Sequence, residues 1–64
     1  MDTEKYLKEL ERKYSEYEYF HVEIYSDGSG CIMGWGLGVD KKEFASFSGL
    51  DDMNKKFEML LERE

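Results

Sequence analysis

The chain has 64 residues, and its length and composition exclude several classes of protein. A domain of this size buries only about 60% of the surface of its unfolded chain, so we expect one domain over residues 1–64 without a deep active-site cleft. Its 15 acidic and 9 basic residues give a net charge of −6, which disfavours direct binding to nucleic-acid phosphates. The only cysteine, Cys31, excludes an internal disulfide, and with one histidine it cannot complete a four-ligand zinc site. We therefore expect no metal and no cofactor.

The sequence also bears on location and assembly. No apolar run is long enough to span a bilayer, and the start lacks the pattern of a signal peptide, so we expect no membrane contact and a soluble, cytoplasmic protein. Domains this small often gain stability from a partner chain. On this ground the sequence favours a homodimer.

Residues 2–14 (DTEKYLKELERKY) have the pattern of an amphipathic helix. Leu7, Leu10 and Tyr14, with Tyr6 beside them, recur at helical spacing and form one apolar stripe. Glu4 and Lys8 stand four residues apart in the order that supports a helix. The sequence therefore predicts a helix over residues 2–14.

From Tyr17 onward the pattern changes to the two-residue period of a strand, which we expect over residues 17–25. Phe20, Val22 and Ile24 share the face that we assign to the core. The opposite face then holds Tyr17, Tyr19, His21, Glu23 and Tyr25. The pair Asp27-Gly28 that follows is typical of a tight hairpin turn.

The second strand is expected over residues 30–39, where glycines alternate with large side chains in GCIMGWGLGV. A two-residue loop at Asp27-Gly28 places Phe20 opposite Trp35 and His21 opposite Gly34, and a four-residue loop keeps the same faces. A three-residue loop would exchange the faces and set core residues opposite glycines, so we exclude it. The glycines would then leave space for the tyrosine rings on the outer face. The side chains predicted to point inward are those of Cys31, Met33, Trp35, Leu37 and Val39.

A third strand is expected over residues 43–47 (EFASF), after a turn at VDKK. Ser48 and Asp51 resemble a capping box at the start of a last helix, whose apolar stripe includes Met53 and Phe57. A competing interpretation begins this helix near Lys41 and removes most of the third strand. The predicted fold is α+β, in the order helix, three antiparallel strands, helix, with both helices on the Phe20 face of the sheet.

No catalytic motif is present in the sequence. His21 is the only histidine and would lie on an open sheet face, and no G-K-[ST] follows the glycines as a phosphate loop requires. We therefore expect no enzymatic activity.

The outer sheet face is instead expected to bind a protein partner or a second copy, because tyrosine is enriched in interfaces and contiguous exposed aromatic surface is unusual on a monomer. A solvated face on which tyrosines only cover glycine backbone is the alternative. The predicted partner-binding residues are Tyr17, Tyr19, His21, Glu23, Tyr25, Asp27 and Glu43. This interpretation requires Trp35 to lie on the side of the sheet opposite Tyr19.

Two resemblances to known families bear on function. VEIYSDG followed by GWGLGVDKKEF resembles part of the double-stranded-RNA-binding domain, a resemblance that implies phosphate contacts by Lys41 and Lys42. The short, acidic, tyrosine-rich α/β chain as a whole is similar to phage-encoded inhibitors of bacterial defence, the anti-CRISPR class. That resemblance implies an inhibitor in the host cytoplasm that blocks a host immune protein acting on nucleic acid.

The expected function is therefore that of a non-enzymatic protein-binding inhibitor, an anti-defence protein with an acidic, tyrosine-rich binding face. Two alternatives stay open at this stage. One is a small RNA- or DNA-binding domain that uses Lys41 and Lys42. The other is a structural homodimer subunit whose outer face is self-complementary.

Overall fold

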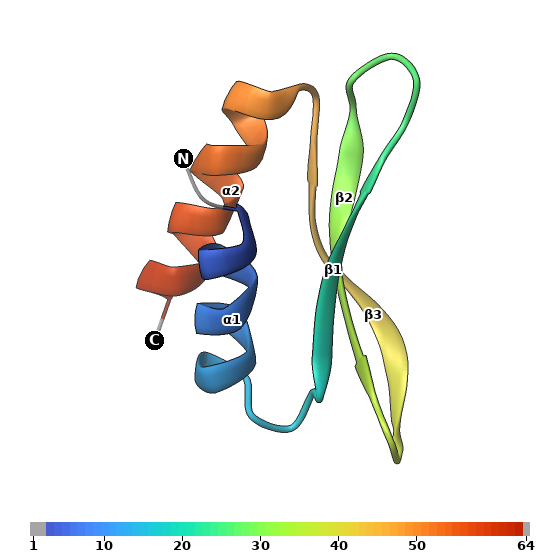
Figure 1. The fold of residues 1–64 in the computed structure, drawn as a ribbon, viewed down its shortest axis with the longest axis vertical. Coiled ribbons are helices and arrows are strands. Elements are labelled where there is room, and N and C mark those ends of the chain that lie inside the picture. The colour runs from blue at the N-terminus through green and yellow to red at the C-terminus, as the bar shows by residue number, and fades with distance from the viewer. Residues whose placement is uncertain (1–2, 64) are drawn as a thin grey trace.

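The computed structural model describes residues 3–63 and contains two helices and three strands. In chain order they are α1 (Thr3–Lys13), β1 (Tyr19–Ile24), β2 (Gly30–Gly36), β3 (Val39–Phe47) and α2 (Leu50–Glu62). The strands form one antiparallel sheet in the order β1-β2-β3. Both helices lie on one side of this sheet, with α1 packed against β1 and α2 against β3 (Figure 1). The predicted α+β fold and its element order are confirmed.

The apolar stripe of α1 joins this helix to α2 and to the sheet. The Tyr6 ring stacks on Phe57 with ring centres 5.0 Å apart. The Tyr14 hydroxyl donates a hydrogen bond of 2.9 Å to the carbonyl oxygen of Leu60. The buried core between helices and sheet consists of Leu10, Phe20, Ile32, Phe47, Met53, Phe57 and Leu60.

The second half of the chain differs from the prediction in its boundaries. β2 ends at Gly36, the turn follows at residues 37 and 38, and β3 already begins at Val39, so the expected turn at VDKK and the competing helix start near Lys41 are both wrong. The predicted Ser48–Asp51 capping box is also wrong. Gly49 occupies the N-cap position without a side-chain hydrogen bond, and the Ser48 N–H donates to Asp52 Oδ2 over 3.1 Å.

The β1–β2 loop contains three residues, Ser26, Asp27 and Gly28, and this length decides the pairing of the strands. The Tyr25 N–H donates to the Ser29 carbonyl over 2.7 Å, and the Gly28 N–H donates to the Tyr25 carbonyl over 3.0 Å. Gly28 has a φ of 90°, and no non-glycine residue in the described chain has a positive φ. A two-residue type I′ turn would need positive φ at Asp27 as well, so the left-handed glycine closes a longer loop instead.

The three-residue loop makes the predicted strand register wrong. Tyr19 pairs with Trp35, Phe20 with Gly34 and His21 with Met33. This pairing exchanges the two faces of β2. Gly30, Ile32 and Gly34 therefore face the helices, whereas the residues predicted to point inward from β2 (Cys31, Met33 and Trp35) lie on the opposite side.

The position of Gly34 explains why the strand tolerates so many glycines. A Cβ atom at Gly34 would lie 2.8 Å from Cε1 of Phe44 and 2.9 Å from Cε2 of Phe20. The two rings therefore occupy the space that a side chain would need. The β2–β3 pairing has a register shift between Ile32 and Met33. Phe44 lies at this shift and packs against Phe20, with ring centres 5.0 Å apart. Glycine on β2 thus makes room for aromatic rings, but on the helix side of the sheet.

Candidate protein-binding surface

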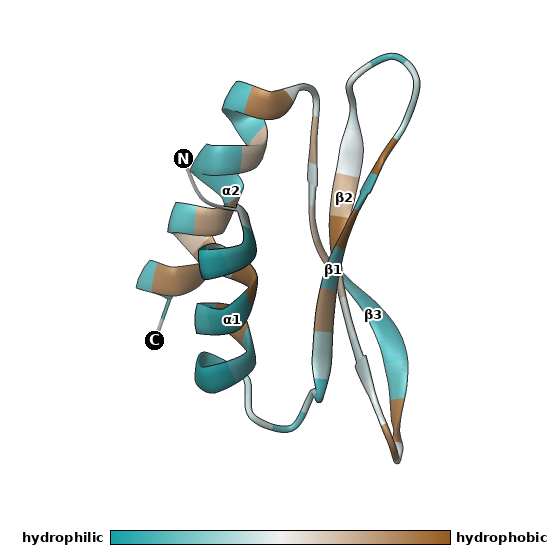
Figure 2. Cartoon of the chain, in the orientation of Figure 1, coloured by the Kyte–Doolittle hydropathy of each residue, from teal (hydrophilic) through white to brown (hydrophobic). Residues whose placement is uncertain are grey.

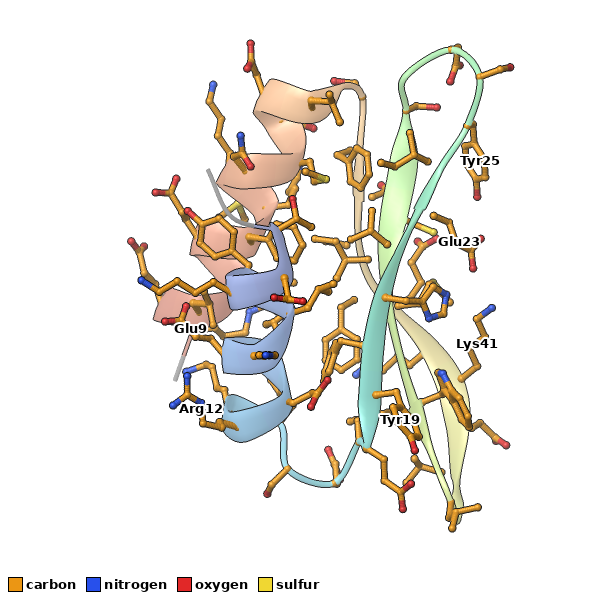
Figure 3. The ribbon with its side chains drawn as sticks, viewed as in Figure 1. Glu9, Arg12, Tyr19, Glu23, Tyr25 and Lys41 are labelled. Atoms are coloured by element: carbon orange, nitrogen blue, oxygen red, sulfur yellow. The ribbon has the colours of Figure 1, made fainter. Side chains whose placement is uncertain are left out.

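The side of the sheet that faces away from the helices, here called the outer face, carries the candidate site. Figure 3 shows Tyr19, Glu23, Tyr25 and Lys41 on this side. Strand pairing adds residues that share the face with them, because directly paired residues point the same way. The outer face comprises Tyr19, His21, Glu23 and Tyr25 from the first strand and its end, Cys31, Met33 and Trp35 from β2, and Lys41 and Glu43 from β3.

Tyr17 does not belong to the outer face, so this predicted site residue is wrongly placed. Its ring packs against the core, with its centre 5.9 Å from that of Phe20 and 5.1 Å from that of Phe44. The Tyr17 N–H donates to the Tyr14 carbonyl over 3.0 Å, so the chain is still turning at this position and β1 begins only at Tyr19.

The most prominent feature of the outer face is an exposed aromatic pair. The rings of Tyr19 and Trp35 have centres 4.9 Å apart and planes inclined by 32°. Their exposed fractions are 51% and 42%. The requirement that Trp35 lie on the side of the sheet opposite Tyr19 is therefore not met, and the predicted tyrosine–glycine face is wrong, because an indole occupies the place where a glycine was expected. A binding role for this face has to rest on the aromatic pair instead. Only a three-residue hairpin loop places Trp35 on the outer face. The hydrophobic pattern argues against that loop, because it sets core residues of β1 opposite the glycines of β2.

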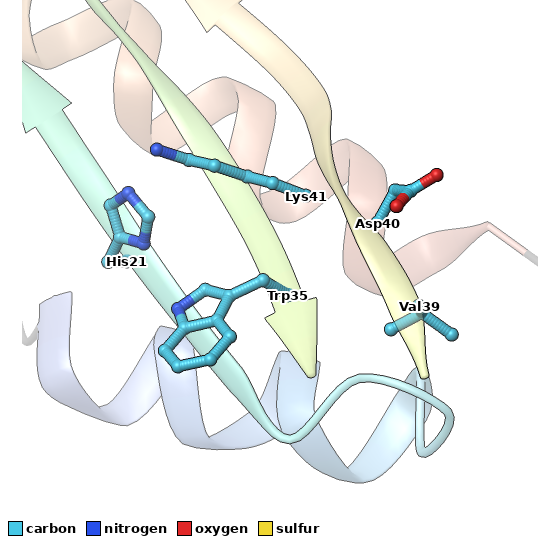
Figure 4. A pocket seen from close by; sticks show the side chains of 5 residues that line it. All are labelled: His21, Trp35, Val39, Asp40 and Lys41. Atoms are coloured by element: carbon cyan, nitrogen blue, oxygen red, sulfur yellow. The ribbon is translucent and has the colours of Figure 1, made fainter. Parts of the chain in front are cut away.

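Further apolar surface adjoins this pair at the β2–β3 hairpin. Leu37 lies in the turn and is 82% exposed. Figure 2 shows this end of the sheet as a hydrophobic tip. A hollow with a volume of about 350 Å³ opens beside Trp35 on the outer face (Figure 4). It is lined by His21, Trp35, Val39, Asp40 and Lys41.

A small ion network lies next to the aromatic pair. Glu23 Oε2 accepts hydrogen bonds from His21 Nε2 and from Lys41 Nζ, each over 3.0 Å. The hydrogen bond from His21 and then the ammonium of Lys41 lower the pKa of Glu23 below its ordinary value. Lys41 thus lies next to a carboxylate, and two further acidic side chains, those of Asp40 and Glu43, lie on or beside the face.

The two lysines suggested by the resemblance to RNA-binding domains do not act together. Lys41 reaches across the outer face to Glu23. Lys42 lies opposite Gly34, and its Nζ is 5.1 Å from the centre of the Phe44 ring, toward the helix side. Their ammonium groups therefore point to opposite sides of the sheet.

Cys31 is buried, although on the side opposite to the predicted one. On the outer face, the Tyr25 hydroxyl oxygen lies 3.9 Å from the Cys31 Sγ. Cys31 is only 4% exposed, whereas Tyr25 is 54% exposed. The hydrogen bond with Cys31 and the nearby charges of Glu23 and Glu43 raise the pKa of Tyr25.

Asp27 serves the hairpin loop rather than the outer face itself. Its Oδ1 accepts hydrogen bonds from the Ser29 N–H over 3.0 Å and from the Ser29 hydroxyl over 2.6 Å. These two bonds hold the pKa of Asp27 below its usual range. The carboxylate stabilises the loop that fixes the register, so its effect on the site is indirect.

Other features of residues 3–63 complete the description of possible sites. A second hollow lies away from the sheet, where Glu9, Arg12 and Lys13 of α1 meet Leu61 of α2. In this range no three His, Cys, Asp or Glu side chains converge as metal ligands, and neither helix is long and apolar enough to cross a membrane. Searches of protein-family models, curated proteins and solved structures find no match for the chain.

Proposed function

We propose that the protein is a non-enzymatic binding module that docks a partner protein on its outer sheet face. The observation that carries this proposal is the exposed Tyr19–Trp35 pair. Tryptophan and tyrosine are the residues most enriched among those that dominate binding energy in interfaces. Here both rings already contact each other and lie on a sheet, so few side-chain rotations are lost when a partner covers them.

Charge indicates the chemistry of the partner. Residues 17–39 contain no Lys or Arg, and on the outer face the ammonium of Lys41 lies beside the carboxylate of Glu23. The chain as a whole carries a net charge of −6. A basic protein surface complements this face, and association with it should be faster at low salt because of electrostatic steering. Inhibition of a host immune protein stays a prediction that rests on the resemblance to the anti-CRISPR class.

Direct nucleic-acid binding has less support. A phosphate backbone is bound by several cations on one surface, whereas Lys41 and Lys42 point to opposite sides of the sheet. A gel-shift titration with duplex RNA at low salt tests this alternative, and we expect no shifted band. A homodimer through the outer face is tested by light scattering with Tyr19→Asp, which would convert such a dimer into monomers.

The decisive experiment compares Trp35→Ala with a matched control. A partner recovered from cell extract with the tagged wild-type chain is purified, and its affinity is measured by calorimetry. Trp35→Ala should weaken binding by about 30-fold or more, the loss of about 2 kcal/mol that defines a dominant interface residue. Met59→Ala is the control, because Met59 is 53% exposed on α2 and lies on the helix side. Equal affinity of the folded Trp35→Ala variant and the control would contradict the proposal.

A further inference from the structure

The sheet has two edges, and only one of them is protected against pairing with another strand. β3 carries the charged run DKKE at residues 40–43, and its pairing with β2 contains two register shifts. Charges and bulges of this kind are the usual devices that keep a sheet edge from pairing. β1, with the sequence YFHVEI, contains no lysine, no proline and no register shift against β2. Its edge is therefore open to a further strand.

The hairpin decides which backbone groups this edge presents. Tyr25 and Ser29 are joined by a hydrogen bond at the end of the hairpin. Antiparallel pairs alternate between bonded and non-bonded, so every second residue along β1 bonds to β2, beginning with Glu23 opposite Cys31. The alternate residues, Phe20, Val22 and Ile24, point their N–H and C=O groups toward the free edge of the sheet, away from β2.

Side chains along β1 define two rows that an added strand would meet. On the helix side, Ile24 is 56% exposed, although it shares a face with the buried Phe20. On the outer face, β1 and β2 contain no Lys or Arg, and Glu23 carries a carboxylate whose Oε2 already accepts hydrogen bonds from His21 and Lys41, so that a basic side chain of an added strand would meet its other oxygen. An incoming strand therefore finds an apolar neighbour on one side and an acidic one on the other.

We propose that an extended, basic segment of a partner protein pairs with β1 as a fourth strand of the sheet. Its Lys or Arg side chains would lie on the outer face beside Glu23, and its alternate apolar side chains would cover Ile24. This proposal rests on the protein-binding function proposed above, and it adds a backbone interaction that the aromatic pair does not require. Strand addition of this type obtains affinity from main-chain hydrogen bonds and specificity from alternate side chains.

A second copy of the chain fits this edge poorly. α1 packs directly against β1 (Figure 1). In an antiparallel pairing, two β1 strands would lie about 4.8 Å apart with both α1 helices on the same side of the joined sheet, so the helices would be crowded against each other. Packed helices need about 8–10 Å between their axes. The occupant is therefore a segment without a helix of its own beneath it.

Amide hydrogen exchange measured by NMR tests the proposal with a synthetic probe. The probe is a peptide of about nine residues, long enough to cover β1, that alternates lysine with valine. At saturating peptide, exchange of the Phe20, Val22 and Ile24 amides should slow by about tenfold or more, whereas amides on the outer edge of β3 should not change. A peptide that alternates glutamate with valine should bind at least about tenfold more weakly. Absence of protection at the β1 amides, or protection at β3 instead, would overturn the proposal.

Two substitutions at one position separate the backbone contribution from that of the side chain. Ile24→Pro removes an outward N–H, a change that an edge strand tolerates, whereas Ile24→Ala removes only the exposed side chain. If the edge pairs, Ile24→Pro should weaken peptide binding about tenfold more than Ile24→Ala. Equal affinities of the two folded variants would exclude pairing at this edge.

The same variants distinguish this proposal from the proposed function. With the recovered partner, loss of affinity in Trp35→Ala but not in Ile24→Pro refutes the edge contact and leaves the outer face as the docking site. Loss in Ile24→Pro but not in Trp35→Ala refutes the role of the aromatic pair and leaves the edge.

Discussion

Replacement of Gly34 by alanine tests the strand register on which the outer face depends. The added methyl group would lie 2.8 Å from the Phe44 ring and 2.9 Å from the Phe20 ring. In the register of a two-residue loop, residue 34 would instead lie opposite His21 on the outer face, where solvent adjoins the sheet and a neighbouring side chain can move aside for a methyl group. The two registers therefore predict stability changes of opposite sign.

The size of the change follows from two opposing contributions. Overfilling a packed core costs about 1–3 kcal/mol. Alanine is more favourable than glycine within a strand by about 0.5–1 kcal/mol, because it restricts the unfolded chain. The net effect of Gly34→Ala is a loss of about 1 kcal/mol, whereas the other register gives a gain of about 0.5–1 kcal/mol. In a 64-residue domain, a loss of about 1 kcal/mol lowers Tm by about 4–8 °C.

Thermal unfolding followed by circular dichroism measures this shift directly. Phe44→Leu in the Gly34→Ala background should recover part of the lost stability, because the smaller side chain makes room for the methyl group. The double-mutant cycle of the two changes should then give a favourable coupling of about 0.5 kcal/mol or more. A Tm of Gly34→Ala equal to or above that of the wild type would refute the register and, with it, the exposed Tyr19–Trp35 pair.

Two further predictions concern ionisation and thiol accessibility. The Ser48 N–H and then Lys56 lower the pKa of Asp52, so its carboxylate stabilises the fold above about pH 4, and this contribution is lost as pH falls through the lowered pKa. Asp52→Asn should therefore lower Tm at about pH 7 and leave it unchanged at about pH 2, and an equal decrease at both pH values would speak against this linkage. Tyr25→Ala should speed the reaction of Cys31 with a thiol reagent by about tenfold or more, since the Tyr25 side chain contacts the buried thiol. Tyr25→Phe, which removes only the hydroxyl, should speed the reaction less, and equal rates in all three proteins would show that another group protects the thiol.

The candidate site was predictable in part. Tyr19, His21, Glu23 and Tyr25 lie on the face where the two-residue period of β1 places them, because Phe20 on the alternate face is strongly apolar and buried. Trp35 was not predictable in this way. On β2 one row holds Cys31, Met33 and Trp35, and the other holds Ile32 among the glycines, so a rule that sends the more apolar row inward selects the wrong one.

The sequence alone determined the helices, the order of the elements and the core face of β1. Periodicity acts within each segment, so local spacing is enough to specify these features. The tertiary structure decided which row of β2 faces the helices. The rings of Phe20 on β1 and Phe44 on β3 occupy the space above Gly34 on β2. These three residues come together only in the assembled sheet, so local sequence patterns do not reveal the contact. A change of one residue in the length of the hairpin loop would exchange the two faces of β2. The packing of these rings above Gly34 selects the register in which Trp35 lies beside Tyr19 on the outer face.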